Sequence, residues 1–195
     1  MIRIYLAGPE VFLPDAAGIG AAKKELCRRH GLEGLFPLDN DLGDAGPGPF
    51  DLAARIFDLN RALIRSADVL IANMTPFRGP SMDVGTAFEV GFADALGRPV
   101  YGYANVEAPF LERVAGALPD GARRDESGRH RDAHGMEIED FGLFENLMIG
   151  VPVCRHGPRV FSGSVPHAAL YTDLAAFEAC LRHVAERFGA GREQT

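Results

Sequence analysis

The sequence contains few cysteines, and their arrangement argues against two classes of protein. Cys27, Cys154 and Cys180 are the three cysteines among 195 residues, and they are far apart in sequence with no CxxC pair. An odd and scattered set of this kind is typical of neither a disulfide framework nor a zinc site. We therefore expect free thiols in a reducing compartment.

Long apolar runs are also missing. No stretch approaches the roughly 18 to 20 consecutive apolar residues that a membrane span requires. The apolar run at residues 2–7 is followed at once by Gly8 and Pro9, and it is too short for a signal peptide. We expect a cytoplasmic protein with no membrane partner.

Positive charge is outnumbered: 20 Lys and Arg residues face 27 Asp and Glu residues, for a net charge of −7. Binding to a nucleic-acid backbone requires a basic face, so we expect no nucleic-acid partner, although a neutral nucleoside remains compatible. The hydrophobic fraction of 47% is ordinary for a globular protein, and the length predicts a single domain spanning residues 1–195.

Metal-binding and phosphate-binding motifs are weak or absent. His130 and His134 have the spacing of a helical metal pair, but they lie in a predicted loop without further convergent ligands. Neither a GxGxxG motif nor a P-loop follows the turn at Gly8 and Pro9. We expect no metal ion and no organic cofactor.

Short apolar segments alternate with amphipathic segments in the first hundred residues. This alternation predicts an α/β fold of the doubly wound, Rossmann-like or flavodoxin-like kind, in which helices cover both faces of a parallel sheet. The expected strands are residues 2–7, 34–37, 69–72 and 100–103, and the expected helices are residues 16–30, 50–66 and 83–96.

The second half of the chain has a weaker pattern. Residues 105–140 are charged and contain glycines, so we expect an irregular insertion there. After it we expect a short helix at 141–149, a strand at 151–154, a closing helix at 168–188 and a frayed tail at 189–195.

A dense group of small and acidic residues follows the third expected strand, where ligands bind in doubly wound sheets. Asp83 is suited to cap the next helix, and Glu89 lies on its second turn. Gly85 leaves room for a ligand between them. A carboxylate at such a place suits attack on a sugar through an oxocarbenium-like transition state. The alternatives are a plain helix cap and a solvated glutamate.

Four motifs, in their order and spacing, resemble the nucleoside 2-deoxyribosyltransferase family. The resemblance covers residues 4–103 and 145–150. It implies an enzyme that cleaves the N-glycosidic bond of a 2′-deoxynucleoside and passes the sugar to another nucleobase. The motifs are Ile4-Tyr-Leu-Ala-Gly-Pro, Asp68-Val-Leu-Ile-Ala-Asn, Asp83-Val-Gly-Thr-Ala-Phe-Glu-Val-Gly-Phe-Ala and Asn146-Leu-Met-Ile.

The resemblance also implies individual roles. Glu89 would be the nucleophile that forms a covalent deoxyribosyl ester. Asp83 would hold the sugar hydroxyls, and Tyr5 would orient Glu89. Asn146 and Met148 would come from a neighbouring subunit, which implies a homo-oligomer with shared active sites.

Further substrate contacts are expected from Gly8, Ser81 and Asn60. Asn60 stands where some family members carry an aspartate near the nucleobase. Ser81, together with Arg78, is a candidate for contact with a 5′-phosphate, with an ordinary surface loop as the alternative. The aromatic C-terminus that transferases of the family often carry is absent, and Asp132 or the acidic run at 137–140 would replace its carboxylate.

Other functions remain open at this stage. Water in place of a second base would make the protein a hydrolase of nucleosides or nucleoside 5′-monophosphates. The core at residues 85–89 also resembles the cytokinin-activating phosphoribohydrolases, but those carry a run of glycines where this chain has Asp83 and Val84. A non-catalytic nucleotide-binding module would not need an ionised Glu89.

Overall fold

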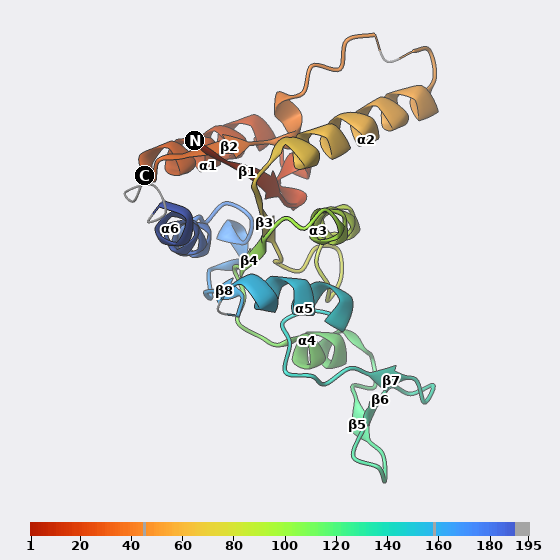
Figure 1. Ribbon diagram of the computed structural model, residues 1–195. Coiled ribbons are helices and arrows are strands. Elements are labelled where there is room, and N and C mark those ends of the chain that lie inside the picture. The colour runs from red at the N-terminus through yellow and green to blue at the C-terminus, as the bar shows by residue number, and fades with distance from the viewer. Residues whose placement is uncertain (45, 158, 190–195) are drawn as a thin grey trace.

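A five-stranded parallel sheet forms the centre of the computed structural model, which describes residues 1–44, 46–157 and 159–189 (Figure 1). The strand order is β2-β1-β3-β4-β8, and every neighbouring pair is parallel. This is the flavodoxin-like order, which confirms the predicted doubly wound α/β fold. The strands are β1 (Ile2–Ala7), β2 (Leu32–Leu35), β3 (Val69–Asn73), β4 (Val100–Ala104) and β8 (Phe161–Ser162).

Helices cover both faces of the sheet because successive strand residues point to opposite sides. In β1, Ile4 and Leu6 pack on the side of α1 and α6, whereas Tyr5 and Ala7 pack on the side of α2, α3 and α5. The inner strands β3 and β4 are therefore buried along their whole length, and they appear as nearly continuous apolar runs in the sequence. The helices are α1 (Ala16–Arg29), α2 (Pro49–Ser66), α3 (Val84–Ala95), α5 (Leu147–His156) and α6 (Ala175–Gly189).

The helix ends follow local chemistry. The Asp15 side chain accepts a hydrogen bond from the Gly18 amide and caps α1, which ends just before Gly31. Gly31 has a φ of +73°, a left-handed conformation that favours glycine. Pro49 is the first residue of α2, where its missing amide hydrogen has no cost. None of the helices in the described ranges is both long and apolar enough to cross a membrane.

The expectation of an irregular insertion at residues 105–140 is wrong. The segment contains α4 (Phe110–Ala117) and a small antiparallel sheet beyond it, at one end of the molecule (Figure 1). Its strands are only two residues long and carry mostly charged side chains, so they have no apolar alternation to detect. They are β5 (Arg123–Arg124), β6 (His130–Arg131) and β7 (Glu137–Ile138).

The predicted strand at 151–154 is also wrong, because those residues belong to α5. A short apolar run has the same appearance in a buried strand and in a buried helix, and Pro152 inside the run favoured neither. The fifth strand of the sheet is β8 instead. The strand expected at 34–37 is β2, which lies two residues earlier, and the helix expected at 141–149 is α5, which begins only at Leu147. The closing helix α6 begins at Ala175 instead of at residue 168. Most of the expected tail, residues 190–195, lies outside the described residues.

Candidate active site

A cavity of about 360 Å³ opens at the carboxyl ends of β1, β2 and β3. In a sheet of this order, the crossover connections change face between β1 and β3, and a ligand crevice forms there. The volume falls in the range of small-molecule sites. The lining residues are Gly8, Val11, Phe12, Pro37, Leu38, Asn40, Leu42, Ile56, Asn60, Asp83, Gly85, Thr86 and Glu89.

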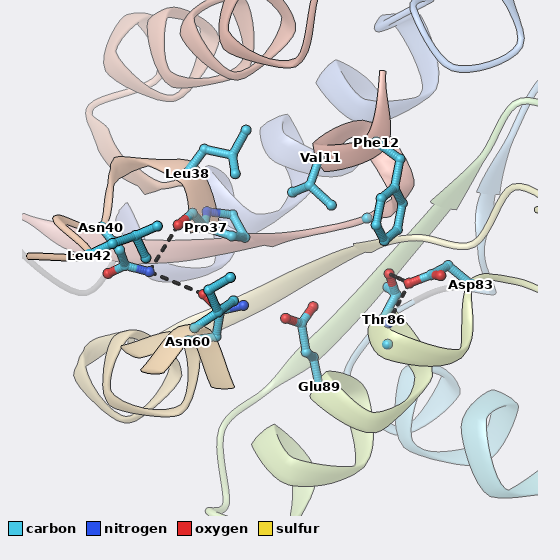
Figure 2. A pocket seen from close by; sticks show the side chains of 13 residues that line it. Val11, Phe12, Pro37, Leu38, Asn40, Leu42, Asn60, Asp83, Thr86 and Glu89 are labelled. Carbon is cyan, nitrogen blue, oxygen red and sulfur yellow. Dashed lines mark hydrogen bonds between the residues drawn. The ribbon is translucent and has the colours of Figure 1, made fainter. Parts of the chain in front are cut away.

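A phenol and a carboxylate are paired at the floor of the cavity. The hydroxyl of Tyr5 donates a hydrogen bond to Oε1 of Glu89 over 2.5 Å. Strand alternation turns Tyr5 toward α3, and Glu89 meets it from the second turn of that helix. The Glu89 carboxylate lies between Asn60 on one side and Asp83 and Thr86 on the other (Figure 2). It is the carboxylate nearest the middle of the cavity in this view.

The surroundings of Glu89 disfavour its charged form. Burial raises the pKa of Glu89 to about 7, the nearby charge of Asp83 acts in the same direction, and the hydrogen bond from Tyr5 opposes both. Burial and the neighbouring Glu89 carboxylate raise the pKa of Tyr5 far above its ordinary value, so Tyr5 remains a hydrogen-bond donor. Glu89 therefore changes charge near neutral pH.

Asp83 has a structural role and lies at the cavity as well. Its Oδ2 accepts hydrogen bonds from the amide and the hydroxyl of Thr86, at 2.8 and 2.9 Å, and so caps α3. The residue is 8% exposed and lines the cavity. A Cβ atom at Gly85 would lie 3.1 Å from the same Oδ2, so the glycine keeps space beside the carboxylate. The cap and the position at the cavity are thus compatible.

Two amide side chains lie together at the cavity wall. Nδ2 of Asn40 donates to the carbonyl oxygen of Pro37 at 2.9 Å and to Oδ1 of Asn60 at 3.1 Å (Figure 2). The backbone carbonyl can only accept, so it determines which end of the Asn40 amide faces inward. Asn60 must then offer its oxygen to Asn40, which leaves its NH₂ group as a donor for a ligand. The sequence did not predict Asn40 as a site residue, because it lies in a loop without a periodic pattern.

Gly8 occupies a position that excludes any side chain. A Cβ atom there would lie 1.9 Å from Oε2 of Glu10 and 2.9 Å from Cβ of Asn73. Glu10 is buried below the loop, and its Oε1 accepts bonds from Lys23, Asn73 and Tyr103. Burial acts to raise the pKa of Glu10, but Lys23 and Tyr103 outweigh it and keep that pKa below its ordinary value. This network supports the loop that carries Gly8 to the cavity.

The buried pair of Glu10 and Lys23 was also missed in the sequence analysis. The signal was present, because Lys23 falls on the buried stripe of α1 together with Ala16, Gly20 and Cys27. A lysine on an apolar helix face requires a buried partner of opposite charge.

Three of the residues expected to bind substrate are not among those lining the cavity of this chain. Ser81 lies in a turn, where its carbonyl oxygen accepts from the Phe77 amide. Asn146 caps α5 through the Met148 amide and donates to Glu139. The Met148 side chain is 72% exposed. The cavity of one chain therefore brings together Glu89, Asp83, Gly85, Gly8 and Asn60, with Tyr5 behind Glu89.

Acidic residues of the insertion that were expected to reach the active site instead form hydrogen bonds with nearby residues. Oδ1 of Asp132 accepts from the amides of His134 and Met136 and stabilises a turn. Glu139 bonds the side chain of Asn146 and the Leu147 amide, so it holds the start of α5. Within the described ranges, no group of three or more His, Cys, Asp or Glu side chains could hold a metal ion.

An arginine lies against the aromatic rim of the cavity. Arg78 has a φ of +57°, which is uncommon for a residue with a side chain. Its guanidinium stacks over Phe77 at 4.6 Å and over Phe12 at 5.3 Å from the ring centroids. Phe12 is a lining residue, so a positive charge lies next to one wall of the cavity.

Comparison with known proteins gives a consistent classification. The family model of nucleoside 2-deoxyribosyltransferase matches residues 4–148. An uncharacterized protein of Schizosaccharomyces pombe is 33% identical over 156 residues, which cover 74% of each chain. The structure of a 2-desoxiribosyltransferase from Leishmania mexicana is similar with a TM-score of 0.67 and 29% identity, covering 96% of this chain and 99% of that one. A conserved protein from Enterococcus faecalis V583 shares the fold, with a TM-score of 0.52, 17% identity and coverage of 94% and 99%.

The chain therefore belongs to the nucleoside 2-deoxyribosyltransferase family. Membership of this family makes the protein an enzyme of the deoxyribosyltransferase-like kind.

Proposed function

We propose that the protein is a nucleoside 2-deoxyribosyltransferase that uses Glu89 as its nucleophile. The observation that carries this proposal is the hydrogen-bonded pair of Tyr5 and Glu89, in a nucleoside-sized cavity at the carboxyl edge of the sheet. A buried carboxylate with a pKa near 7 is more basic than an ordinary glutamate and ionises at physiological pH. Such a group is suited to attack a sugar.

The reaction would proceed in two displacements at the anomeric carbon. In the first, an ionised Glu89 oxygen forms a bond to C1′ while the C1′–N bond breaks and its electron pair leaves with the base. In the second, a ring nitrogen of another base attacks C1′ and gives up its proton to water, and the ester electron pair returns to Glu89. The two inversions cancel, so the product keeps the β configuration. Tyr5 would orient the carboxylate, and Asp83 would hold a sugar hydroxyl.

The leaving base would lie against the wall that carries Asn60. The NH₂ group of Asn60 is directed by Asn40 and can donate to an acceptor atom of the base. An amide is not an acid, so it can stabilise negative charge on the departing base but cannot protonate it. The proton of the released base would then come from water. Apolar side chains form the rest of this wall, among them Leu38, Leu42 and Ile56.

We propose a homo-oligomer that completes the site. Asn146 and Met148 do not line the cavity of their own chain, and Met148 is exposed at the start of α5. Val84 and Phe88, on the neighbouring helix α3, are exposed apolar residues as well. An apolar face of this kind is suited to contact a second copy, whose cavity would receive the Asn146 segment.

A second candidate is hydrolysis of a nucleoside 5′-monophosphate, and the position of Arg78 favours it. Its guanidinium is next to Phe12 at the cavity, where it could neutralise a phosphate. In that case water would replace the second base. The residues that form the ester would be the same.

A base-exchange assay tests the proposal and separates the two candidates. The protein is incubated with a 2′-deoxynucleoside and an excess of a different free base, and the products are identified. A new β-deoxynucleoside supports transfer. Release of free 2-deoxyribose, or of its 5-phosphate from a nucleotide, at a rate that added base does not change would support hydrolysis. The Glu89→Ala variant should lose either activity by several orders of magnitude.

A further inference from the structure

A buried ion pair outside the cavity connects the segments that carry Asp83 and Asn146. Arg113 belongs to α4, and Glu145 immediately precedes the Asn146 cap of α5. Nη2 of Arg113 lies 3.1 Å from Oε2 of Glu145, and their side chains are 6% and 1% exposed. Burial of two charges costs desolvation free energy, which further hydrogen bonds must offset. The other hydrogen bonds of Arg113 and Glu145 therefore identify the backbone segments that the pair holds in place.

Arg113 uses each of its nitrogen atoms on a different stretch of backbone. Nε donates to the carbonyl of Pro80 at 2.7 Å, Nη1 to that of Ala108 at 2.8 Å, and Nη2 to that of Phe144 at 2.7 Å. Its guanidinium also stacks on the Phe144 ring, 4.4 Å from the centroid. The planar fork of an arginine has donors on three nitrogen atoms and can reach three carbonyls that lie apart, whereas the three donors of a lysine all leave from one nitrogen atom.

Glu145 holds two backbone amides. Its Oε2 accepts from the Met82 amide at 3.0 Å, and its Oε1 accepts from the Asn146 amide at 3.1 Å. Met82 is the residue before Asp83, and Pro80 lies two residues earlier. The pair therefore bonds the backbone on the N-terminal side of Asp83 at two points, the Pro80 carbonyl and the Met82 amide. It also bonds the backbone at the start of α5 at two points, the Phe144 carbonyl and the Asn146 amide.

We infer that Arg113 and Glu145 are positioning residues that place Asp83 at the cavity and Asn146 at the start of α5. This inference rests on the proposed function, because it assumes that Asp83 holds a sugar hydroxyl. It also assigns a role to the 105–140 insertion, since α4 brings Arg113 to the loop before Asp83. Neither side chain lines the cavity, so their effect on substrate must pass through the backbone they hold.

The variants Glu145→Gln and Arg113→Lys probe the pair with small changes of shape. A glutamine amide has one acceptor oxygen, so it can satisfy the Met82 amide or the Asn146 amide but not both in the same manner. Arg113→Lys keeps the charge opposite Glu145 and loses the fork. Arg131→Lys is the matched control, because Arg131 pairs with Asp125 in the small sheet.

The test compares kcat/KM for a 2′-deoxynucleoside with that for analogues lacking the 3′-hydroxyl or the 5′-hydroxyl. A ratio of this kind does not depend on the fraction of folded enzyme, so partial unfolding does not affect it. The variant Asp83→Asn identifies which hydroxyl Asp83 binds. We expect Glu145→Gln and Arg113→Lys to lower the same ratio by about tenfold, as misplacement of a substrate contact does, while Arg131→Lys leaves it unchanged.

The outcomes separate the two levels of the argument. If Asp83→Asn lowers the ratio and both pair variants retain the wild-type ratio, the positioning role is refuted and the proposed function stands. If the wild-type protein acts on no deoxynucleoside, or Glu89→Ala remains active, the proposed function itself fails. If Glu145→Gln yields no soluble protein, Arg113→Lys decides the question alone.

Discussion

The substitution Glu89→Gln should stabilise the protein above neutral pH while abolishing its activity. The pKa of Glu89 is about 7 in the folded protein and has an ordinary value of 4.5. Below pH 4.5 the carboxyl is neutral in both the folded and the unfolded chain, so its ionisation does not affect stability. Above pH 7 it is ionised in both, and the folded chain bears the cost of the buried charge.

The magnitude follows from the difference between the two pKa values. At about 1.4 kcal/mol for each pKa unit, the ionised carboxylate costs the folded protein roughly 3 kcal/mol above pH 7. Glutamine has nearly the same shape and can still accept the hydrogen bond from Tyr5, but it is never charged. For a chain of this length, about 3 kcal/mol corresponds to roughly 10 °C in the thermal midpoint.

Thermal denaturation from pH 4.5 to 8.5 measures this effect. The thermal midpoint of Glu89→Gln should rise relative to that of wild type as the pH increases from 4.5 to 7. The difference should be small at pH 4.5 and constant above pH 7. Glu186→Gln, on the exposed surface of α6, is the control for loss of a carboxylate and should run parallel to wild type. If the thermal midpoint of Glu89→Gln also runs parallel to that of wild type from pH 4.5 to 8.5, the buried charge at Glu89 is refuted.

Four other substitutions test the site. Tyr5→Phe removes the hydrogen bond that lowers the pKa of Glu89, so the rise of kcat/KM with pH should move above 7 in a pH–rate profile. Asp83→Asn removes a charge that raises the same pKa, so the rise should move to lower pH, and an unchanged profile would contradict the coupling. Asn60→Ala should lower kcat/KM by about tenfold through loss of one hydrogen bond, with a much smaller effect on a deaza base that lacks the acceptor. Gly8→Ala should destabilise the protein by about 1 to 3 kcal/mol in denaturant titrations, because its Cβ would overlap Glu10; wild-type stability would show that the loop can move.

The central fold was accessible from the sequence because its signals are local. Strands buried on both faces appear as short apolar runs, and the helices between them carry caps such as Asp15 and breakers such as Gly31. The small sheet of residues 123–138 has no such signal, since strands of two residues cannot show a period. Residues 151–154 were ambiguous for the opposite reason, because an apolar run of four suits a strand and a helix equally.

The site was accessible in part. Asp83, Gly85 and Glu89 lie in one short segment at a predicted helix start, and the chain order placed them at the carboxyl edge of the sheet. Asn40 lies in a loop with no period, and only the fold brings it to Asn60.

The sequence by itself determined the doubly wound fold, the candidate carboxylates and the family, because periodicity, caps and motif spacing are properties of neighbouring residues. The tertiary structure decided the burial, the hydrogen-bond partners and the pKa values of those residues. Tyr5 and Glu89 are 84 positions apart, and only strand β1 packed against helix α3 creates the hydrogen bond and the burial that set the pKa of Glu89. Arg113 and Glu145 likewise meet across 32 residues. A charge in a folded protein depends on the distance and polarity of groups from remote segments, and these quantities exist only once the chain has packed.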